Sequence, residues 1–381
     1  MIAPIRTLSL FLLLFLLASC ASSKLQYDKS VEDWAGQQAP AQLAIKHTVF
    51  LIGDAVKADP ASNEVLQLLG KHLAKADENS SVIFLGNNVL PEGIPSKSQS
   101  KTLRKIATAK IDQQLALLDQ FEGKPYFIAG NEDWKGDDVR SVRRLEKYIE
   151  KKLNADIEDE DDWEDYFFAG NACGGPQIVE VNDQLLFLFV DSNWYLKDWD
   201  RAHPSLNEDC AALSRPVFRF LFEELARKYK NKNVIIASYH PLVSYGEHGG
   251  RSSLKEHIFP LTRYGDNAYL PLPGIGTLGV ALRAYAGTRQ DLAHPIYKRM
   301  RDDMLFGANK NGSFIFAASH EDNLQYIEQR KQKYIISGSG SETAPVTLGK
   351  GSQFAYGGRG FSKVDFYEDG SAWLSFYALD E

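Results

Sequence analysis

Five polar clusters contain the residues of this chain that could do chemistry, and each cluster follows a short apolar run. They are Gly53-Asp54, Gly86-Asn87-Asn88, Gly130-Asn131-Glu132-Asp133, Tyr239-His240 and Ser319-His320. Carboxylate, amide and imidazole groups bind divalent metal ions, and carboxylates and imidazoles also transfer protons during hydrolysis. A single cluster of this kind is expected at any turn, because turns favour Gly, Asn and Asp. Five clusters that include two histidines indicate instead a shared site.

The apolar runs before the clusters predict strands, and the amphipathic segments between them predict helices. We expect helices over residues 61–76, 101–121, 139–153 and 217–229. We expect strands over residues 47–53, 81–86, 125–130, 177–181, 185–190, 233–238, 313–317, 324–328, 333–337, 362–367 and 372–377. Strands that alternate with helices and then dominate predict an α/β fold with mixed sheets. Sites in open α/β sheets lie at the carboxyl ends of strands, so the five clusters should meet.

The order and spacing of the clusters resemble those of the calcineurin-like metallophosphoesterases, in particular the purple or tartrate-resistant acid phosphatase branch. That family carries the blocks GDxG, GDNxY, GNHD, a His-Pro segment and GHxHNLQ. This chain carries GDAV at Gly53, GNNVLPEG at Gly86, GNEDW at Gly130, YHPLVSYGEHGG at Tyr239 and SHEDNLQY at Ser319. The resemblance covers about residues 47 to 380. It implies two mixed β-sheets packed face to face with flanking helices, a four-layer sandwich, and a two-metal site between the strand ends.

Four positions match the metal ligands that the resemblance implies. Asp54 matches the first-metal carboxylate, and Asn131 matches the amide ligand of the second metal. His240 matches the histidine of the His-Pro segment, and His320 matches the first histidine of the last block.

Four other positions depart from the family pattern, and all of them carry function in the family. Asn87 replaces the bridging aspartate, and Leu90 replaces the tyrosine that binds ferric iron. Glu132 replaces a histidine that assists phosphate binding and leaving-group protonation, and Asp322 replaces the second histidine of the last block. Two divalent cations about 3.5 Å apart repel by up to about 19 kcal/mol at an effective dielectric constant of about 20. A neutral amide at position 87 cannot offset that repulsion.

We therefore interpret the chain as a degenerate metallophosphoesterase that is weak or inactive and acts as a scaffold or partner subunit. The residual ligand set would hold at most one divalent ion, Zn²⁺, Mn²⁺ or Mg²⁺, and the catalytic groups that remain are His240 and the substituted Glu132. The alternative is an active metal-dependent phosphatase that hydrolyses phosphate monoesters in the periplasm. The partial metal set consists of Asp54, Asn87, Asn131, His240, His320 and Asp322.

The first 19 residues predict a signal peptide. Arg6 precedes an apolar run over residues 8–18, which is shorter than the ~20 residues that a bilayer span requires. The run ends in Leu-Ala-Ser-Cys, which resembles the bacterial lipobox and implies an acylated, palmitate-bearing Cys20. Residues 20–43 are polar and predict a tether, and residues 44–381 form the metallophosphoesterase-like domain. Because Ala21 rather than Asp follows the cysteine, we expect anchoring at the outer membrane, facing the periplasm.

The remaining features concern partners. Cys173 and Cys210 predict a disulfide, because an exported chain meets an oxidising compartment. The 381-residue chain has a net charge of −7, which argues against a nucleic-acid-binding function. Some relatives are joined to outer-membrane β-barrel assembly modules, so the resemblance implies such a barrel or its assembly machinery as a partner. A Gly- and Pro-rich apolar stretch over residues 264–289 is the expected partner surface.

Overall fold

The computed structural model describes residues 21–56, 63–89, 93–96, 98, 100–134, 139–168, 174–196, 215–263 and 268–379. Cys20, Leu90, Cys173 and Cys210 lie outside these residues, so the lipid, the lost tyrosine position and the disulfide stay predictions. No helix among the described residues is both long and apolar enough to cross a membrane.

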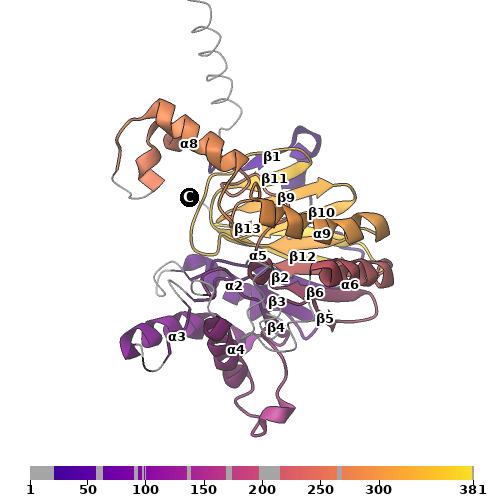
Figure 1. Cartoon of the computed structure of the whole chain (residues 1–381). Helices are drawn as coiled ribbons and strands as arrows, with labels where there is room; N and C mark the ends of the chain where they lie inside the picture. Colours follow the sequence, from indigo (N-terminus) through magenta and orange to yellow (C-terminus); the bar gives the residue numbers. More distant parts are fainter. Residues whose placement is uncertain are drawn as a thin grey trace, which may run out of the picture.

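Two mixed β-sheets face each other at the centre of the molecule (Figure 1). The smaller sheet has the strand order β13-β12-β2-β3-β4, and the larger has the order β1-β11-β9-β10-β8-β7-β6-β5. The smaller sheet contains β2 (Ile45–Ile52), β3 (Ser80–Phe84), β4 (Lys124–Phe127), β12 (Gly360–Tyr367) and β13 (Ala372–Ala378). The larger contains β1 (Gln26–Tyr27), β5 (Gln177–Glu180), β6 (Leu185–Val190), β7 (Asn233–Ser238), β8 (Ile315–Ala318), β9 (Leu324–Gln329), β10 (Gln332–Ser337) and β11 (Ser352–Tyr356).

Helices cover the outer face of each sheet. On the smaller sheet lie α2 (Glu64–Leu73), α3 (Lys101–Ala116), the 3₁₀ turn η3 (Leu117–Gln120) and α4 (Val139–Leu153). On the larger sheet lie α5 (Ser192–Leu196), α6 (Arg215–Lys228) and α9 (Pro295–Asn311). The remaining elements are η1 (Lys29–Gly36), η4 (Glu160–Asp162), α7 (Leu254–Ile258), η7 (Pro260–Arg263) and α8 (Pro273–Tyr285).

Three apolar layers hold these four layers of structure together. One lies between the sheets, and one lies under the helices on each side. The strands β3 and β6 are buried along their whole length, which explains their continuous apolar sequences. This α/β sandwich confirms the predicted fold class and is consistent with a metallophosphoesterase-like fold.

Parallel pairing brings the strand ends together. In the smaller sheet β2, β3 and β4 are parallel, and in the larger sheet β6, β7, β8 and β10 are parallel. Their carboxyl ends therefore reach the same edge of each sheet. The two edges touch, because the Gly53 amide donates to the Ser337 carbonyl at 2.8 Å and the Gly340 amide donates to the Gly53 carbonyl at 3.1 Å.

The polar segment that follows residue 20 differs from the expected tether. Ser22 and Val346 exchange two backbone hydrogen bonds of 2.9 and 3.0 Å, and β1 pairs antiparallel with the edge of β11. The η1 turn places Val31 in a buried position. Parts of residues 21–36 are therefore paired with the body, because edge pairing uses backbone groups that a polar sequence also possesses. The role of residues 20–43 as a tether stays a prediction.

Candidate functional site

The carboxyl ends of five strands carry the predicted cluster residues. Asp54 follows β2, Asn87 follows β3, Asn131 follows β4, His240 follows β7 and His320 follows β8. We call these five residues the strand-end site. The contacts described below bring them together in space, as the parallel order of the strands requires. Their roles as metal ligands stay a prediction.

The backbone at this site has an uncommon conformation. Asp54, Asn87, His320 and Asp322 have φ angles of 51°, 55°, 74° and 46°. Asp, Asn and His tolerate this left-handed region better than other residues with a Cβ, and such strain concentrates at functional sites. Only two other described non-glycine residues, in the turn between β9 and β10, have a positive φ.

The loops after β3 and β4 approach each other too closely for any side chain larger than hydrogen. A Cβ at Gly86 would lie 2.7 Å from the Gly130 nitrogen, and a Cβ at Gly130 would lie 2.3 Å from the Asn87 nitrogen. The two glycines therefore allow the Asn87 and Asn131 loops to share one corner of the site.

The carboxylate of Asp54 is buried and receives four hydrogen bonds. Oδ1 accepts from Asn87 Nδ2 at 2.7 Å and from the Tyr239 hydroxyl at 3.2 Å. Oδ2 accepts from the His320 backbone amide at 3.0 Å and from the Ser319 hydroxyl. Two carboxylate oxygens offer about four acceptor directions, so protein donors occupy the capacity of this group.

Tyr239 lies at the centre of the strand-end site. Its phenol oxygen accepts a hydrogen bond from Asn87 Nδ2 at 2.5 Å, while its hydrogen is directed to Asp54. Burial raises the pKa of Tyr239 well above its ordinary value, and the nearby carboxylates of Asp54, Asp322 and Glu132 raise it further. The phenol is therefore neutral and is surrounded by negative charge.

The loop after β4 closes one side of the site. The Glu132 amide donates to Asn87 Oδ1 at 3.0 Å, and Asn131 Nδ2 donates to Glu132 Oε1 at 2.9 Å. Asn131 Oδ1 is buried and has no hydrogen-bond partner. Asn131 is thus a predicted ligand whose oxygen is still available to a cation or a water molecule.

Three histidines form the other side. His240 Nδ1 pairs with the Ser192 hydroxyl at 2.9 Å, and His240 Nε2 donates to Gln290 Oε1 at 2.5 Å. Burial lowers the pKa of His240 to about 3, so the imidazole is neutral. His320 Nε2 lies 3.0 Å from the Gln290 carbonyl oxygen, and the His248 ring stacks on the His320 ring at 3.8 Å.

A buried ion-pair network fixes the Gln290 segment. His248 Nδ1 and Arg283 both contact Asp291 Oδ1, at 2.9 and 2.7 Å, and Arg283 also pairs with Glu247. Burial alone would raise the pKa of Asp291, but the hydrogen bonds from His248 and Arg283 hold it below the ordinary range. Because Arg283 belongs to α8, this helix is tied to the histidines of the site.

Asp133 has a structural role beside the site. Its fully buried carboxylate accepts from the amides of Gly130, Asn88 and Val89 at 2.8, 3.2 and 3.0 Å, and from Asn88 Nδ2 at 3.0 Å. Burial raises the pKa of Asp133 to about 7, against the effect of these donors. The carboxyl group thereby joins the loops after β3 and β4.

The arrangement does not fit a paired-metal centre. Among the described residues, no three His, Cys, Asp or Glu side chains are grouped so that they could hold a metal ion. The acceptor positions of Asp54 are filled by donors, and both His240 and His320 direct Nε2 at Gln290. A cation would have to displace these protein groups before it could bind.

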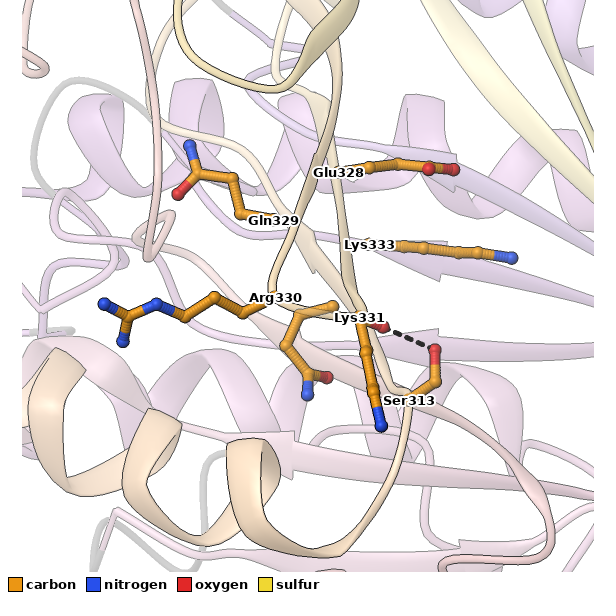
Figure 2. Close-up of a pocket in the computed structure, with 7 residues that line it drawn as sticks. Ser313, Glu328, Gln329, Arg330, Lys331 and Lys333 are labelled. Atoms are coloured by element: carbon orange, nitrogen blue, oxygen red, sulfur yellow. Dashed lines mark hydrogen bonds between the residues drawn. The ribbon is translucent and has the colours of Figure 1, made fainter.

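A surface hollow lies elsewhere and does not mark the site. It surrounds the turn between β9 and β10 and is lined by Ser313, Glu328, Gln329, Arg330, Lys331, Gln332 and Lys333. Figure 2 shows Glu328 and Lys333 side by side, whereas Arg330 and Lys331 point in other directions. The Ser313 hydroxyl donates a hydrogen bond of 2.6 Å to the Lys331 carbonyl. Because no polar groups converge there, we assign no ligand to it.

Sequence analysis placed Tyr239 and Ser319 in the polar clusters but gave them no role, although each stands one position before a predicted histidine at a strand end. It missed Gln290, which lies 50 residues after its partner His240 and directly follows the stretch that was expected to be a partner surface. No local pattern marks it.

The comparisons with known proteins match the architecture alone. No family model and no curated protein matches the chain. One similar structure is GAP50, the anchor in the inner membrane complex of Plasmodium, at 15% identity and a TM-score of 0.46, over 88% of this chain and 85% of that one. A second is the sulfate thiohydrolase SoxB of Thermus thermophilus, at 10% identity and a TM-score of 0.39, over 90% of this chain and 58% of that one. A third is Vps29 of Chaetomium thermophilum, at 8% identity and a TM-score of 0.26, over 87% of this chain and 97% of that one.

Proposed function

We propose that this chain is a phosphoesterase-like domain that has lost efficient ester hydrolysis and acts as a scaffold or partner subunit in the cell envelope. A lipid on Cys20 anchors it to the outer membrane, on the periplasmic side. The single observation that supports the loss of hydrolysis is the filling of the ligand positions by protein groups. Four donors occupy Asp54, and Gln290 occupies the Nε2 atoms of His240 and His320.

Hydrolysis in a two-metal site requires free ligand atoms and a positive field that attracts the phosphate. Here the groups that donate hydrogen bonds to Asp54 belong to Asn87, Tyr239, Ser319 and His320. The neutral amide of Asn87 cannot replace a bridging carboxylate. The positive charge of Arg283 is also largely neutralised by its own partners. Arg283 approaches His248 at 3.2 Å but is already paired with Asp291 and Glu247.

Anchoring and partner choice are supported by the sequence. The lipobox-like segment ends at Cys20, and the described chain begins directly on the body at Ala21. An outer-membrane β-barrel or its assembly machinery is the partner that the family resemblance suggests.

Two measurements on the full-length protein, purified from membranes in detergent, test the proposal. The first is the metal content, and the second is the hydrolysis of p-nitrophenyl phosphate with added Zn²⁺, Mn²⁺ or Mg²⁺. We expect less than one ion per chain and no turnover above that of a His240→Ala variant. One or two tightly bound ions per chain, together with turnover that His240→Ala abolishes, would establish the phosphatase alternative.

Two variants at position 290 test the cause of the loss. Gln290→Ala removes the side-chain amide from His240 Nε2, whereas the Gln290 backbone carbonyl beside His320 Nε2 stays in place. A freed imidazole nitrogen is a good Zn²⁺ ligand. We expect this variant to bind more Zn²⁺ than the parent protein, while Gln290→Glu binds it as well through the new carboxylate. If neither variant gains affinity, Gln290 is not what excludes the ion.

A further inference from the structure

The helix α8 exposes an apolar stripe to solvent. Ile275, Leu278, Leu282 and Tyr285 are 64%, 59%, 59% and 84% exposed. Their spacing of three, four and three residues places them on one side of an α-helix. We call these four residues the α8 stripe.

The opposite side of α8 is fixed to the body. A Cβ at Gly276 would lie 2.3 Å from the His257 carbonyl oxygen, so α7 and α8 touch along their backbones. Arg283 holds the end of the helix through Asp291. The stripe is therefore held outward on a helix that is packed on its other side.

The surroundings of the stripe are also apolar and basic. Eight of the seventeen exposed large apolar side chains in the described part of the chain lie within residues 254–285. Residues 251–290 contain five Lys or Arg and two Asp or Glu, although the whole chain has a net charge of −7. Of these five, Arg283 is already paired with Glu247 and Asp291, so the other four carry the basic character of this surface. An apolar stripe flanked by basic residues is typical of helices that lie in the headgroup region of anionic membranes.

The chain that lies outside the structure ends beside this surface. The first described amide, that of Ala21, donates to the Ser252 carbonyl at 3.2 Å, and Ser252 stands two residues before α7. Figure 1 shows α8 and β1 toward the top of the molecule, with α3 and α4 toward the bottom. An acyl chain on Cys20 would therefore enter the membrane next to the α7–α8 pair.

We propose that the α8 stripe lies on the lipid bilayer and inserts its four side chains at the level of the headgroups. The inference rests on the lipid anchor of the proposed function for the position of the membrane. It adds a second contact, which orients the body so that α8 faces the lipid and α3 faces away from it. The lipid supplies both the apolar layer that covers the leucines and the phosphates that meet the basic residues.

The test uses the full-length protein in vesicles of phosphatidylethanolamine and phosphatidylglycerol that contain a lipid with a nitroxide near its headgroup. An environment-sensitive fluorophore is attached to a cysteine introduced by Tyr285→Cys, and unsubstituted protein gives the background of the native cysteines. The control position is Ile106→Cys on α3, which is 48% exposed. We expect nitroxide quenching at position 285 and none at position 106.

Two paired substitutions test the stripe itself, with the label kept at position 285. Leu278→Asp with Leu282→Asp should weaken the equilibrium between the inserted and free stripe roughly a hundredfold, because each buried leucine adds about a factor of ten to partitioning, and the quenched fraction should fall accordingly. Leu103→Asp with Ile106→Asp, an exposed pair on α3, should leave quenching unchanged. Thermal unfolding of both double variants confirms that they are folded.

The other occupants of the stripe have distinct outcomes. A fluorophore at position 285 that is shielded from water but not quenched by the nitroxide lipid would mean that a second copy or residues 1–20 cover the stripe, and it would overturn the proposal. Quenching at both positions would overturn the orientation. Mass spectrometry of the N-terminal peptide separates the two proposals: a lipidated Cys20 without quenching refutes the contact alone, and quenching without a lipid refutes the anchor alone.

Discussion

Replacing Asn87 by aspartate tests whether Asp54 is a hydrogen-bond acceptor or a ligand position. The Asn87 amide nitrogen lies 2.7 Å from Asp54 Oδ1, and both residues are buried. Asn87→Asp removes that donor and brings two carboxylates together. At an effective dielectric constant of about 20, two unit charges at this distance repel by at most about 6 kcal/mol.

The protein can avoid this repulsion by keeping a proton on the new carboxyl group. Holding a proton on a group whose unfolded pKa is about 3.9 costs about 1.4 kcal/mol for each pH unit above that value. The loss of stability is thus limited to about 2 kcal/mol at pH 5.5 and rises to about 5–6 kcal/mol at pH 8. Because the folded pKa of the introduced group is raised, stability is retained at low pH and lost as the pH increases.

Urea unfolding of the parent protein and of Asn87→Asp at pH 5.5 and pH 8 measures this difference. The charge-exchanged double variant, Asp54→Asn with Asn87→Asp, is the control, because it keeps one carboxylate and one amide. We expect it to be more stable than Asn87→Asp at pH 8. Equal losses at both pH values would refute the assignment of Asp54 as the buried acceptor beside position 87.

Divalent metal gives the same variant a second readout. A cation that binds only the folded state stabilises it by RT ln(1 + [L]/Kd). If the two carboxylates at positions 54 and 87 regain a cation site, Mn²⁺ or Zn²⁺ should raise the unfolding midpoint of Asn87→Asp at pH 8 and leave the parent unchanged. An equal rise in both proteins would contradict the filled ligand positions described above.

Three further predictions concern buried ionisable groups. His47 pairs with Ser81 at 2.8 Å, and burial lowers the pKa of His47 to about 4. The folded protein therefore keeps its full stability above pH 6.5, and as the pH falls toward 4 it should lose about 3 kcal/mol of unfolding free energy relative to His47→Gln. Parallel curves of stability against pH for the two proteins would refute this. Asp133→Ala leaves four donors without an acceptor and should lower the free energy of unfolding by roughly 3 kcal/mol, and a loss below about 1 kcal/mol would contradict its structural role. Arg283→Met leaves the buried Asp291 carboxylate without its cationic partner. The substitution should lower the free energy of unfolding by about 3 kcal/mol and speed proteolysis within α8. Unchanged cleavage would show that other contacts fix the helix.

The strand ends were predictable because each depends on local sequence. An apolar run that stops at Gly-Asp or Gly-Asn marks both the end of a buried strand and the start of a turn, as at Asp54 and Asn87. α4 and β7 have the predicted bounds, since α4 has a regular helical spacing of apolar residues and β7 is a short continuous apolar run. The prediction of the fold therefore rested on the apolar periodicity and on the family resemblance together.

The contacts that decide the chemistry were not predictable in this way. The position of Gln290 between His240 and His320 depends on how α8 returns to the body, and no local pattern encodes that path. The helix α9 was overlooked although Pro295 and a regular apolar spacing mark it. By contrast, β11 has five residues between glycine-containing turns, which is too short for a reliable pattern.

The pairing of β1 with β11 has a consequence for any shortened form of the protein. A chain that starts at residue 44 would leave unpaired those N–H and C=O groups of β11 that face β1, while the opposite edge stays paired with β9. The open edge would belong to a strand that contains Phe354 and Tyr356. Unprotected margins of this kind recruit strands from other molecules and promote aggregation. Light scattering should therefore detect self-association of the shortened chain under conditions in which a chain that starts at Ala21 stays monodisperse.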